Sequence, residues 1–392
     1  MDITQVATLV NSVTSEKLGQ SAILEDNLAN VVDVGNAIFN NMSYDVFTKS
    51  LIDRITKIIF VDRKYVGALA KLKREQFEYG IKEKLYLTEL PVAVDDDAWK
   101  LTDNTTYTQD TFKQPSAAAL FYQHQNNFRI DLSVAEKQVK TAFMNAGELN
   151  SFVSLLFTQV DNSLEIKMEG LSEATIAYLA AQTIYDDISD LDPSKTGIKA
   201  VNLLKLYNEQ FGTTLEVKDA IFTPEFIRFA VLTISEYTDR LKKASTLFNI
   251  GGLVRFTPKE KQELLLLSKF KKAADVYLQS DTFNEEYTAL PMSESVAYWQ
   301  GSGTNYSFDN ISKIHVDIKD PADPTKTIEV EFGGILGVLF DYEAAGIDNE
   351  ERTVSSHVNA AALFTNYFYH QSCRNWTDGN ENAVVFFIGE KT

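Results

Sequence analysis

A period of two in the apolar residues constrains this chain more than any other feature of its sequence. Apolar residues stand at odd positions before a polar stretch and at even positions after it. They are Phe77, Tyr79, Ile81, Leu85 and Leu87, and then Leu120, Tyr122, Phe128, Ile130, Leu132 and Val134. Such alternation is typical of β-strands. Residues 77–134 are therefore predicted to form one two-stranded ribbon, whose arms of about fifteen residues reach on the order of 50 Å.

A ribbon of this length needs a surface on which to lie. A hairpin alone is marginally stable in water, and the apolar stripe of this one has little of its own to cover it. The economical partner is a neighbouring copy of the same chain, which indicates an assembly subunit and not an enzyme. The residues expected at this interface are Phe77, Tyr79, Ile81, Lys82, Lys84, Asp95, Asp96, Asp97, Tyr122, Phe128 and Arg129.

Charged segments supply candidate pairings for that interface. We expect Lys82, Lys84, Arg129 and a basic segment before the ribbon to meet the acidic tip at residues 95–97 or the acidic run at 186–192. The basic segment contains Arg63, Lys64, Lys71, Lys73 and Arg74. It is the candidate for contact with DNA or with an acidic neighbour, and a solvated strand edge is its simpler interpretation.

Composition places the chain among soluble globular proteins. With 392 residues it is long enough for a sizeable core, and its net charge of -18 argues against nucleic acid as a tightly held ligand, because phosphate binding needs clustered cations. The lone Cys373 excludes an intramolecular disulfide, fits a reducing compartment, and is expected to be a small core residue. Without a signal peptide or an apolar run of about 18 residues, the protein is expected to stay in a cytoplasm until it assembles, with no contact to membranes.

The remaining sequence predicts a mixture of helices and strands. Residues 1–44 have weak periodicity and predict an extended or partly disordered arm. A long helix is predicted over 148–187, with Gly170 as its weak point. The other predicted elements are helices near 45–61, 197–211, 224–244 and 271–280, an apolar run at 264–267, a hairpin pairing 314–318 with 328–332, and strands near 361–371 and 383–388.

The sequence gives no support for a catalytic, cofactor or metal site. The four histidines, His124, His315, His357 and His370, are far apart and match no metal-binding spacing. The acidic run at 186–192 lacks the central Gly and final Glu of a calcium loop, so a solvated hinge is favoured. Gly333, Gly334 and Gly337 match a dinucleotide fingerprint poorly and indicate a tight backbone turn.

Four segments, taken in order, resemble one known family. They are FTKSLIDRITKIIF (47–60), LFYQHQNNFRIDLSVAEKQVKTAFMNAGELNSFVSLLF (120–157), KQELLLLSKFKKAADVYL (261–278) and ALFTNYFYHQSCRNWTDGNENAVVFFI (362–388). Together with the order of elements, they resemble the major capsid proteins of small short-tailed phages of the Bacillus phage phi-29 type, which have the Hong Kong 97-type capsid fold. One departure is Thr257-Pro258-Lys259-Glu260, a good helix start where the family has a strand soon after, so at most one helical turn is expected there.

The resemblance implies an α+β fold with a definite division of the chain. The implied parts are an N-terminal arm (1–44), a segment leading into the peripheral domain (45–76), an extended β-ribbon loop (77–134), a peripheral domain with a spine helix (135–187 and 345–392) and an axial domain (188–344). It also implies pentamers and hexamers of this chain in an icosahedral or prolate shell, assembled in a bacterial cytoplasm around double-stranded DNA. A scaffolding protein and a portal are the other implied partners.

Two other classes of protein remain as alternatives. A cellular nanocompartment shell, similar to the encapsulins, uses the same fold and would package an enzyme in place of DNA. A hydrolase with an acidic surface and a β-rich insertion would be monomeric and would carry a well-formed polar pocket.

Overall fold

The computed structural model describes residues 3–18, 23–41, 46–51, 69, 72–75, 82–88, 93, 100–106, 116–122, 125–144, 146–279, 293–299, 307–320, 323 and 325–390. The chain divides into two compact units. The first comprises residues 1–79, 125–171 and 348–374, and the second comprises residues 80–124, 172–347 and 375–392. This division differs from the predicted domains, because residues 172–187 and 375–392 fall in the second unit.

Two helices occupy the N-terminal segment, so the prediction of an extended arm is wrong for its described residues. α1 covers Ile3–Leu18 and α2 covers Val31–Asn41. Their apolar residues are buried at helical spacing, as Val6, Val10 and Val13 show in α1. The Asn, Ser and Thr residues between them weaken the pattern in the sequence, because these residue types favour caps and turns. Burial of one face outweighs that local preference.

The core of the first unit joins these helices to residues 46–51 and to the elements around 134–160. Phe143 is at its centre, with its ring in edge-on contact with Phe39 and Phe47 and 5.5 Å between centroids in each pair. Such edge-to-face packing adds to the free energy gained by burial. The N-terminal segment is therefore part of a folded core.

A four-stranded sheet in the order β1-β11-β12-β4 forms the other layer of this unit. Its strands are β1 (Lys73–Glu75), β4 (Asn126–Ala135), β11 (Ala345–Asn359) and β12 (Phe364–Thr377). β4 pairs antiparallel with β12, from Ala135 opposite Phe364 to Asn126 opposite Cys373. The prediction that 77–134 is one ribbon is therefore wrong beyond Tyr122. The alternation in β4 is real, but a partner strand in the core buries its apolar face better than a free hairpin arm would.

The predicted long helix is confirmed. α5 covers Ala146–Asp187, 42 residues, and follows the short helix α4 (Glu136–Ala142). Gly170 does not end it. This glycine is exposed, and a Cβ atom added there would have nothing within 4 Å.

Replacing Gly170 by alanine is expected to raise the free energy of unfolding by about 0.5–1 kcal/mol, because glycine loses more backbone entropy than alanine in a helix interior. Urea unfolding followed by circular dichroism measures the change. Gly35→Ala in α2 is the contrasting variant, since a Cβ there would lie 2.6 Å from Cβ of Phe143 and should destabilise the protein. An unchanged or lower stability for Gly170→Ala would contradict the prediction.

Cys373 is fully buried in β12, and its Sγ lies 3.7 Å from the backbone oxygen of Asn126. Burial, followed by the charge of Glu350, raises the pKa of this thiol to about 11. The thiol is therefore protonated at pH 8, and thiolate is the reactive form. Native protein at pH 8 is expected to react with iodoacetamide at least about a hundredfold more slowly than protein in urea, as measured by mass spectrometry. Equal rates would show that the thiol is accessible in the native state.

The second unit is built on a five-stranded sheet in the order β5-β13-β10-β6-β7. Its strands are β5 (Ala200–Asn202), β6 (Gln262–Leu267), β7 (Ser293–Val296), β10 (Ile335–Asp341) and β13 (Ala383–Phe387). The central strand β10 is antiparallel to both of its neighbours, whereas β13 pairs with β5, and β6 with β7, in parallel. Every residue of β10 and β13 is buried, which explains why these segments read as continuous apolar runs.

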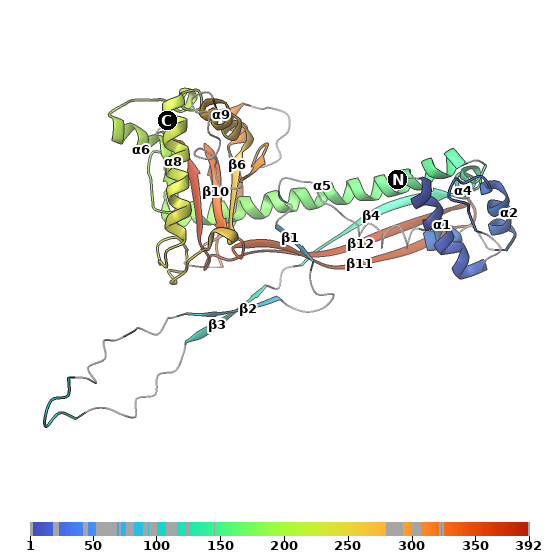
Figure 1. The fold of residues 1–392 in the computed structure, drawn as a ribbon, viewed down its shortest axis with the longest axis horizontal. Helices are drawn as coiled ribbons and strands as arrows, with labels where there is room; N and C mark the ends of the chain where they lie inside the picture. The colour runs from blue at the N-terminus through green and yellow to red at the C-terminus, as the bar shows by residue number, and fades with distance from the viewer. Residues whose placement is uncertain are drawn as a thin grey trace. The chain divides into compact units, whose positions relative to one another are not determined.

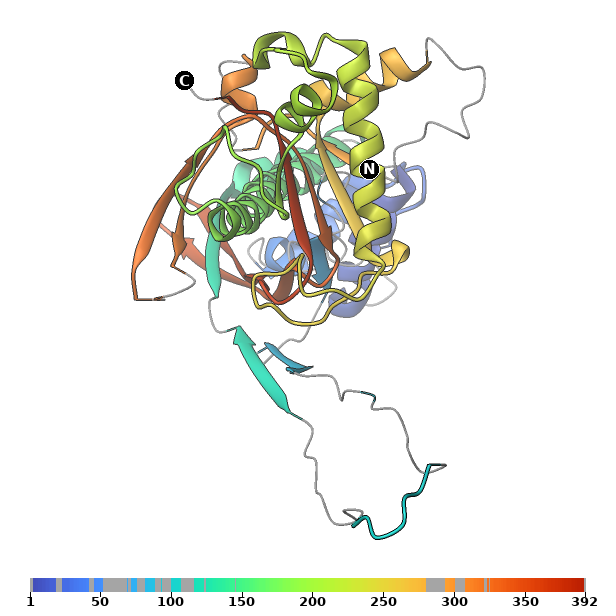
Figure 2. The same cartoon turned by 90° about the vertical axis from the view of Figure 1, so that its left-hand side faces the viewer.

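Helices pack around this sheet (Figures 1 and 2). They are α6 (Leu203–Phe211), α7 (Val217–Ala220), α8 (Pro224–Leu241), α9 (Ser268–Gln279) and α10 (Phe308–Ile311). Tyr237 of α8 lies edge-on to Phe386 of β13 with 5.3 Å between ring centroids, which places α8 on the sheet. α8 begins with Pro224 after Thr223, at the predicted start, and α6 ends at Phe211 before Gly212, whose φ is 64°. The prediction of a helix from about 197 is wrong at its start, because residues 200–202 form β5.

Two further predictions for this unit are confirmed. Residues 259–261 form a single 3-10 turn, η3, and the chain passes directly into β6. The hairpin of β8 (Ile314–Lys319) and β9 (Thr327–Phe332) has the expected pairs, including Val316 opposite Val330. The acidic run is more ordered than a solvated hinge, because the Asp187 carboxylate accepts hydrogen bonds from the backbone of Lys199 and Ala200.

In the part of the chain that the structure describes, no helix has the length and apolar character needed to cross a membrane.

Candidate functional site

The base of the ribbon is the most distinctive site in the second unit. β2 (Lys82–Leu87) pairs antiparallel with β3 (Ala117–Tyr122), from Lys82 opposite Tyr122 to Leu87 opposite Ala117. This register places odd residues opposite odd residues. Leu85 and Leu87 therefore share one face with Phe121, while Leu120 and Tyr122 share the other face with Lys84. The single apolar stripe predicted from the sequence is wrong, because it requires odd residues to pair with even ones.

The face that carries Lys82, Lys84 and Tyr122 lies against the C-terminal segment. The ammonium group of Lys82 is 3.8 Å from the centroid of the Trp376 ring, and the Tyr122 ring is 5.2 Å from the same indole. The guanidinium of Arg255 is 5.7 Å from the centroid of Tyr86. These cation–π and ring contacts fix the ribbon at its base and leave the opposite face exposed.

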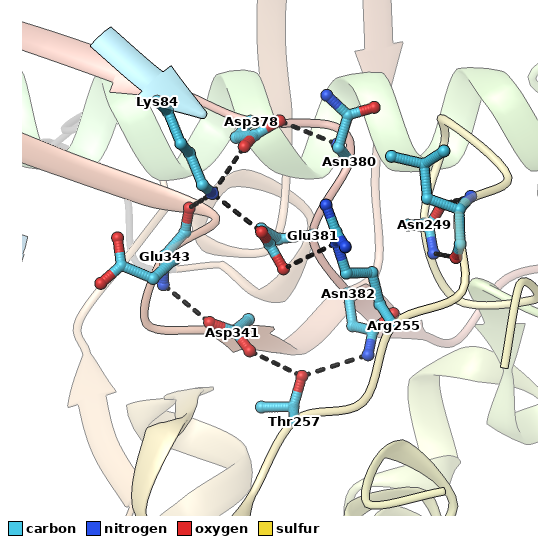
Figure 3. A network of polar contacts seen from close by, with 11 residues as sticks. Lys84, Asn249, Arg255, Thr257, Asp341, Glu343, Asp378, Asn380, Glu381 and Asn382 are labelled. Atoms are coloured by element: carbon cyan, nitrogen blue, oxygen red, sulfur yellow. Dashed lines mark hydrogen bonds and ion pairs between the residues drawn. The ribbon is translucent and has the colours of Figure 1, made fainter. Parts of the chain in front are cut away.

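Lys84 is the centre of a polar network (Figure 3). Its Nζ donates hydrogen bonds to Asp378 Oδ2 at 2.6 Å, to Glu381 Oε1 at 2.8 Å and to the backbone oxygen of Glu343 at 3.2 Å. The side chain of Asp378 is 1% exposed and that of Lys84 is 18% exposed. Three acceptors satisfy the three protons of the ammonium group, which is the condition for burying a charge.

Further bonds connect this network to the sheet (Figure 3). The Thr257 hydroxyl donates to Asp341 Oδ2 at 2.7 Å and accepts from the Asn382 amide at 3.1 Å. The other oxygen of Asp341 accepts from the backbone N–H of Glu343 at 2.8 Å. The end of β10, the start of β13 and the ribbon are therefore held by one connected set of polar groups.

The titration of these groups reflects their burial. Burial works against the ammonium form of Lys84, but Asp378 and Glu381 outweigh it and hold the pKa of Lys84 above its ordinary value. Burial raises the pKa of the Glu381 carboxyl, and the Lys84 ammonium offsets only part of that shift. Burial, and then the charge of Asp378, raises the pKa of the Tyr122 phenol. The site therefore contains a protonated lysine and a neutral phenol at neutral pH.

This arrangement is suited to holding a strand in place. The charged side chains are paired with one another. Within the described part of the chain, no cluster of three or more His, Cys, Asp or Glu side chains is placed to hold a metal ion.

The structure separates the predicted interface residues into groups. Lys82, Lys84 and Tyr122 lie together and contact their own chain, and their contact with a neighbouring copy stays a prediction. Phe128 and Arg129 are on β4 in the first unit, where Arg129 Nε bonds Asp131 Oδ1 at 2.6 Å. Lys73 and Arg74 are half-buried on β1. The remaining predicted residues, Phe77, Tyr79, Ile81, Asp95, Asp96, Asp97, Arg63, Lys64 and Lys71, lie outside the described residues.

Sequence reasoning missed the partners of Lys84. Asp378 and Glu381 follow the strand β12 in a stretch that carries only the turn signals of Asp, Gly and Asn residues. A separation of 294 residues between Lys84 and Asp378 leaves no periodicity that would pair them. The signal that was available was the placement of lysines at alternate positions in a predicted strand.

Comparison with known proteins identifies the family. The model of the phi29-like phage major capsid protein family matches residues 10–387. The major capsid protein of Bacillus phage GA-1 is 24% identical over 246 residues, which cover 61% of this chain and 50% of that protein. The corresponding protein of Bacillus phage B103 is 24% identical over 216 residues, 54% of this chain and 46% of that protein. The chain thus spans about half the length of the curated relatives it matches.

Chains of two solved phage structures are similar to this chain at low sequence identity. A chain of the capsid structure of Staphylococcus phage Andhra is 11% identical, with a TM-score of 0.47 over 81% of this chain and 83% of that one. A chain of the native bacteriophage P68 structure is 10% identical, with a TM-score of 0.49 over the same shares. The observed order of N-terminal segment, ribbon, long helix, mixed domain and returning strands is the order expected of the Hong Kong 97-type fold. Because the family match extends over nearly the whole length, this chain belongs to the phi29-like phage major capsid protein family.

Proposed function

We propose that this chain is a non-catalytic shell subunit, many copies of which close into the icosahedral or prolate head that encloses the double-stranded DNA of a phage. Membership of a capsid protein family supports the proposal. The observation that carries it in the structure is the ribbon, which is anchored firmly on one face and left open on the other.

The open face of the ribbon carries three large apolar side chains beside the exposed Glu83. Leu85 is 73% exposed and Phe121 is 52% exposed, and Leu87 lies beside them. Covering each such side chain contributes about 1.5–3 kcal/mol. A paired strand with an exposed apolar face is a natural contact for another molecule. We assign that face to a neighbouring copy in the shell.

The proposal also includes contacts with DNA, with neighbouring subunits and with other proteins of the phage. A net charge of -18 favours an enclosing role toward DNA without sequence-specific binding. Arg63, Lys64, Lys71, Lys73 and Arg74 are proposed to contact DNA or an acidic neighbour, and Asp95, Asp96 and Asp97 to meet cations of an adjacent subunit. A scaffolding protein and a portal are proposed as the partners that set the size of the shell, and the bacterial cytoplasm as the place of assembly.

Negative-stain electron microscopy of the expressed protein, alone and with its neighbouring gene products, tests the proposal. Shells, tubes or rings are the expected result. Particles that contain a copurified enzyme and no DNA would favour a nanocompartment. A protein that remains monomeric with all of its gene neighbours would require the shell function to be abandoned.

A triple variant tests the role of the ribbon face. Leu85→Ser, Leu87→Ser and Phe121→Ser together are expected to reduce particle yield by about tenfold or more, because three apolar contacts are lost at every subunit interface. Circular dichroism should be unchanged, since these side chains are exposed in the single chain. Ile166→Ser, on the exposed side of α5, is the control. Normal particle yield from the triple variant would remove this face from the interface.

A further inference from the structure

The turn that binds the ribbon contains a chemically reactive pair of residues. Asp378 is followed by Gly379, and no other Asp-Gly pair and no Asn-Gly pair occurs in the sequence. Asp-Gly pairs rearrange more readily than other aspartyl pairs, because glycine has no side chain to hinder attack of its backbone nitrogen on the aspartyl carboxyl. The product is isoaspartate, in which the backbone runs through the former side-chain carboxyl.

This rearrangement consumes no reagent other than water. The nitrogen of Gly379 forms a bond to Cγ of a protonated Asp378 carboxyl. The C–OH bond breaks, and one water leaves with the proton of the Gly379 N–H. A second water then opens the five-membered imide, and opening at the original backbone carbonyl gives isoaspartate. One water is lost and one is taken up, so the net change is an isomerisation.

The ribbon anchor engages both oxygens of the Asp378 carboxylate (Figure 3). Oδ2 accepts from Nζ of Lys84 at 2.6 Å, and Oδ1 accepts from the backbone N–H of Asn380 at 2.9 Å. The Asp378 side chain is 1% exposed. Imide formation needs a protonated carboxyl, whereas an ion pair with an ammonium group favours the ionised carboxylate. The contact with Lys84 therefore opposes the first step of the reaction.

The backbone of the turn is held in place as well. The Gly379 oxygen accepts from the N–H groups of Ile250 at 2.8 Å and Gly251 at 3.1 Å. The backbone oxygen of Asp378 accepts from the Glu381 N–H at 3.3 Å. Imide formation reshapes the backbone at both reacting residues, so these bonds must break before the reacting atoms are aligned. The pair is therefore expected to react only after the turn opens locally.

We infer that Asp378-Gly379 is a site of isoaspartate formation which Lys84 protects, so that modification follows detachment of the ribbon from its anchor. Lys84 is a positioning residue in this inference. Isoaspartate adds a methylene group to the backbone and leaves the carboxylate on a shorter arm, so the modified turn cannot restore both contacts of Asp378. The inference goes beyond the proposed shell function and does not depend on it.

The rate of isoaspartate formation at position 378 tests the inference. The native chain, Lys84→Met and Lys84→Arg are incubated together at neutral pH, and peptide mapping with electron-transfer fragmentation measures isoaspartate. Lys84→Met is expected to react about tenfold faster than the native chain or more, because the rate follows the population of the open form. Lys84→Arg keeps a cation beside Asp378 and should react more slowly than Lys84→Met.

Two comparisons set the limits of this experiment. Lys242→Met removes an exposed ion pair with Asp239 and should react at the rate of the native chain. The native chain in guanidinium chloride gives the rate of the unprotected turn. Equal rates for Lys84→Met and the native chain would overturn the inference. Native protein that reacts as fast under native conditions as in guanidinium chloride would overturn it too.

A second pair of variants keeps the test valid if Lys84→Met does not fold. Asp378→Asn closes the same imide with loss of ammonia in place of water, and mass spectrometry detects the deamidated product. Lys84→Met combined with Asp378→Asn has no uncompensated charge at position 378 and should fold more readily than Lys84→Met alone. This double variant is expected to deamidate about tenfold faster than Asp378→Asn. Equal deamidation would show that Lys84 does not protect the turn.

The consequence for the anchor has its own measurement. The native chain is aged in guanidinium chloride and refolded, and the hydrogen exchange of the β2 amides is compared between modified and unmodified chains. The modified chains should exchange these amides faster, because their ribbon is no longer held by Lys84. Equal exchange would overturn the inference that isoaspartate at this turn releases the ribbon.

Discussion

Replacing Lys84 by methionine is expected to lower the free energy of unfolding by about 3 kcal/mol and to release the base of the ribbon. Methionine keeps the length of the side chain but removes the ammonium group. Asp378, 1% exposed, and Glu381 would then remain buried without the cation that compensates their charge. Urea unfolding measures the loss, and hydrogen exchange of the β2 amides reports the release of the ribbon.

Two variants separate the role of the ion pair from a general loss of packing. Lys84→Met combined with Asp378→Asn is expected to recover part of the lost stability, because one uncompensated charge is removed. Lys242→Met breaks an exposed pair with Asp239 and should cost under about 1 kcal/mol. If Lys84→Met is no more harmful than Lys242→Met, the network does not anchor the ribbon.

The pH dependence of the same variant has a definite sign. The pKa of Lys84 is raised in the folded chain above its ordinary value of 10.5, so its contribution to stability is full below that pH and is lost as the pH rises through the folded value. The stability difference between the native chain and Lys84→Met is therefore expected to be constant near neutral pH and to shrink above about pH 10.5. Glu381 also has a raised pKa, so its contribution to stability is present below its ordinary value and is lost as the pH rises and its carboxyl ionises in the folded chain.

Elements with strong local signals are predictable from this sequence. α5 and α8 follow the helical period, and Pro224 and Gly212 mark helix ends by their own backbone geometry. The hairpin of β8 and β9 was predictable in register, because its apolar residues have only one way to face the core. In each case the local pattern and the tertiary packing favour the same structure.

Elements that depend on distant partners were not predictable. β4 has the alternation of a ribbon arm, but its partner is β12, more than two hundred residues away, and nothing local distinguishes these two pairings. The register of β2 against β3 depends on what lies under Lys82 and Lys84, so the sequence alone placed Leu85 and Tyr122 on one face. The helices α1 and α2 were missed because their stability comes from burial against Phe143 and β4 more than from helix propensity.

The candidate site was also predictable only in part from the sequence. The sequence named Lys84 as a cationic partner for residues 95–97 or for the acidic run at 186–192. Its partners Asp378 and Glu381 became visible only when β12 and β13 placed the turn between them beside the ribbon. These partners within the chain were not predicted, and a contact of Lys84 with a neighbouring copy stays a prediction.

Replacing Gly334 by alanine is expected to cost about 3 kcal/mol of stability or more, for two reasons that add. Its φ is +79°, a conformation that costs a residue with a Cβ atom roughly 1–2 kcal/mol. A Cβ atom there would also overlap the backbone oxygen of Ile388, and that segment cannot move freely because the Ile388 N–H donates to the Gly334 oxygen at 2.9 Å. The start of β10 and the end of β13 would both be displaced.

Gly212→Ala is the matched control for this prediction. Gly212 also has a positive φ, 64°, but a Cβ atom added there would have nothing within 4 Å. Replacing Gly212 by alanine should lower the free energy of unfolding only through the strained backbone conformation, by about 1 kcal/mol. The difference between the two variants in urea unfolding therefore measures the close approach of Gly334 to Ile388. Equal losses would mean that the two segments can separate without cost when a Cβ atom is added at Gly334.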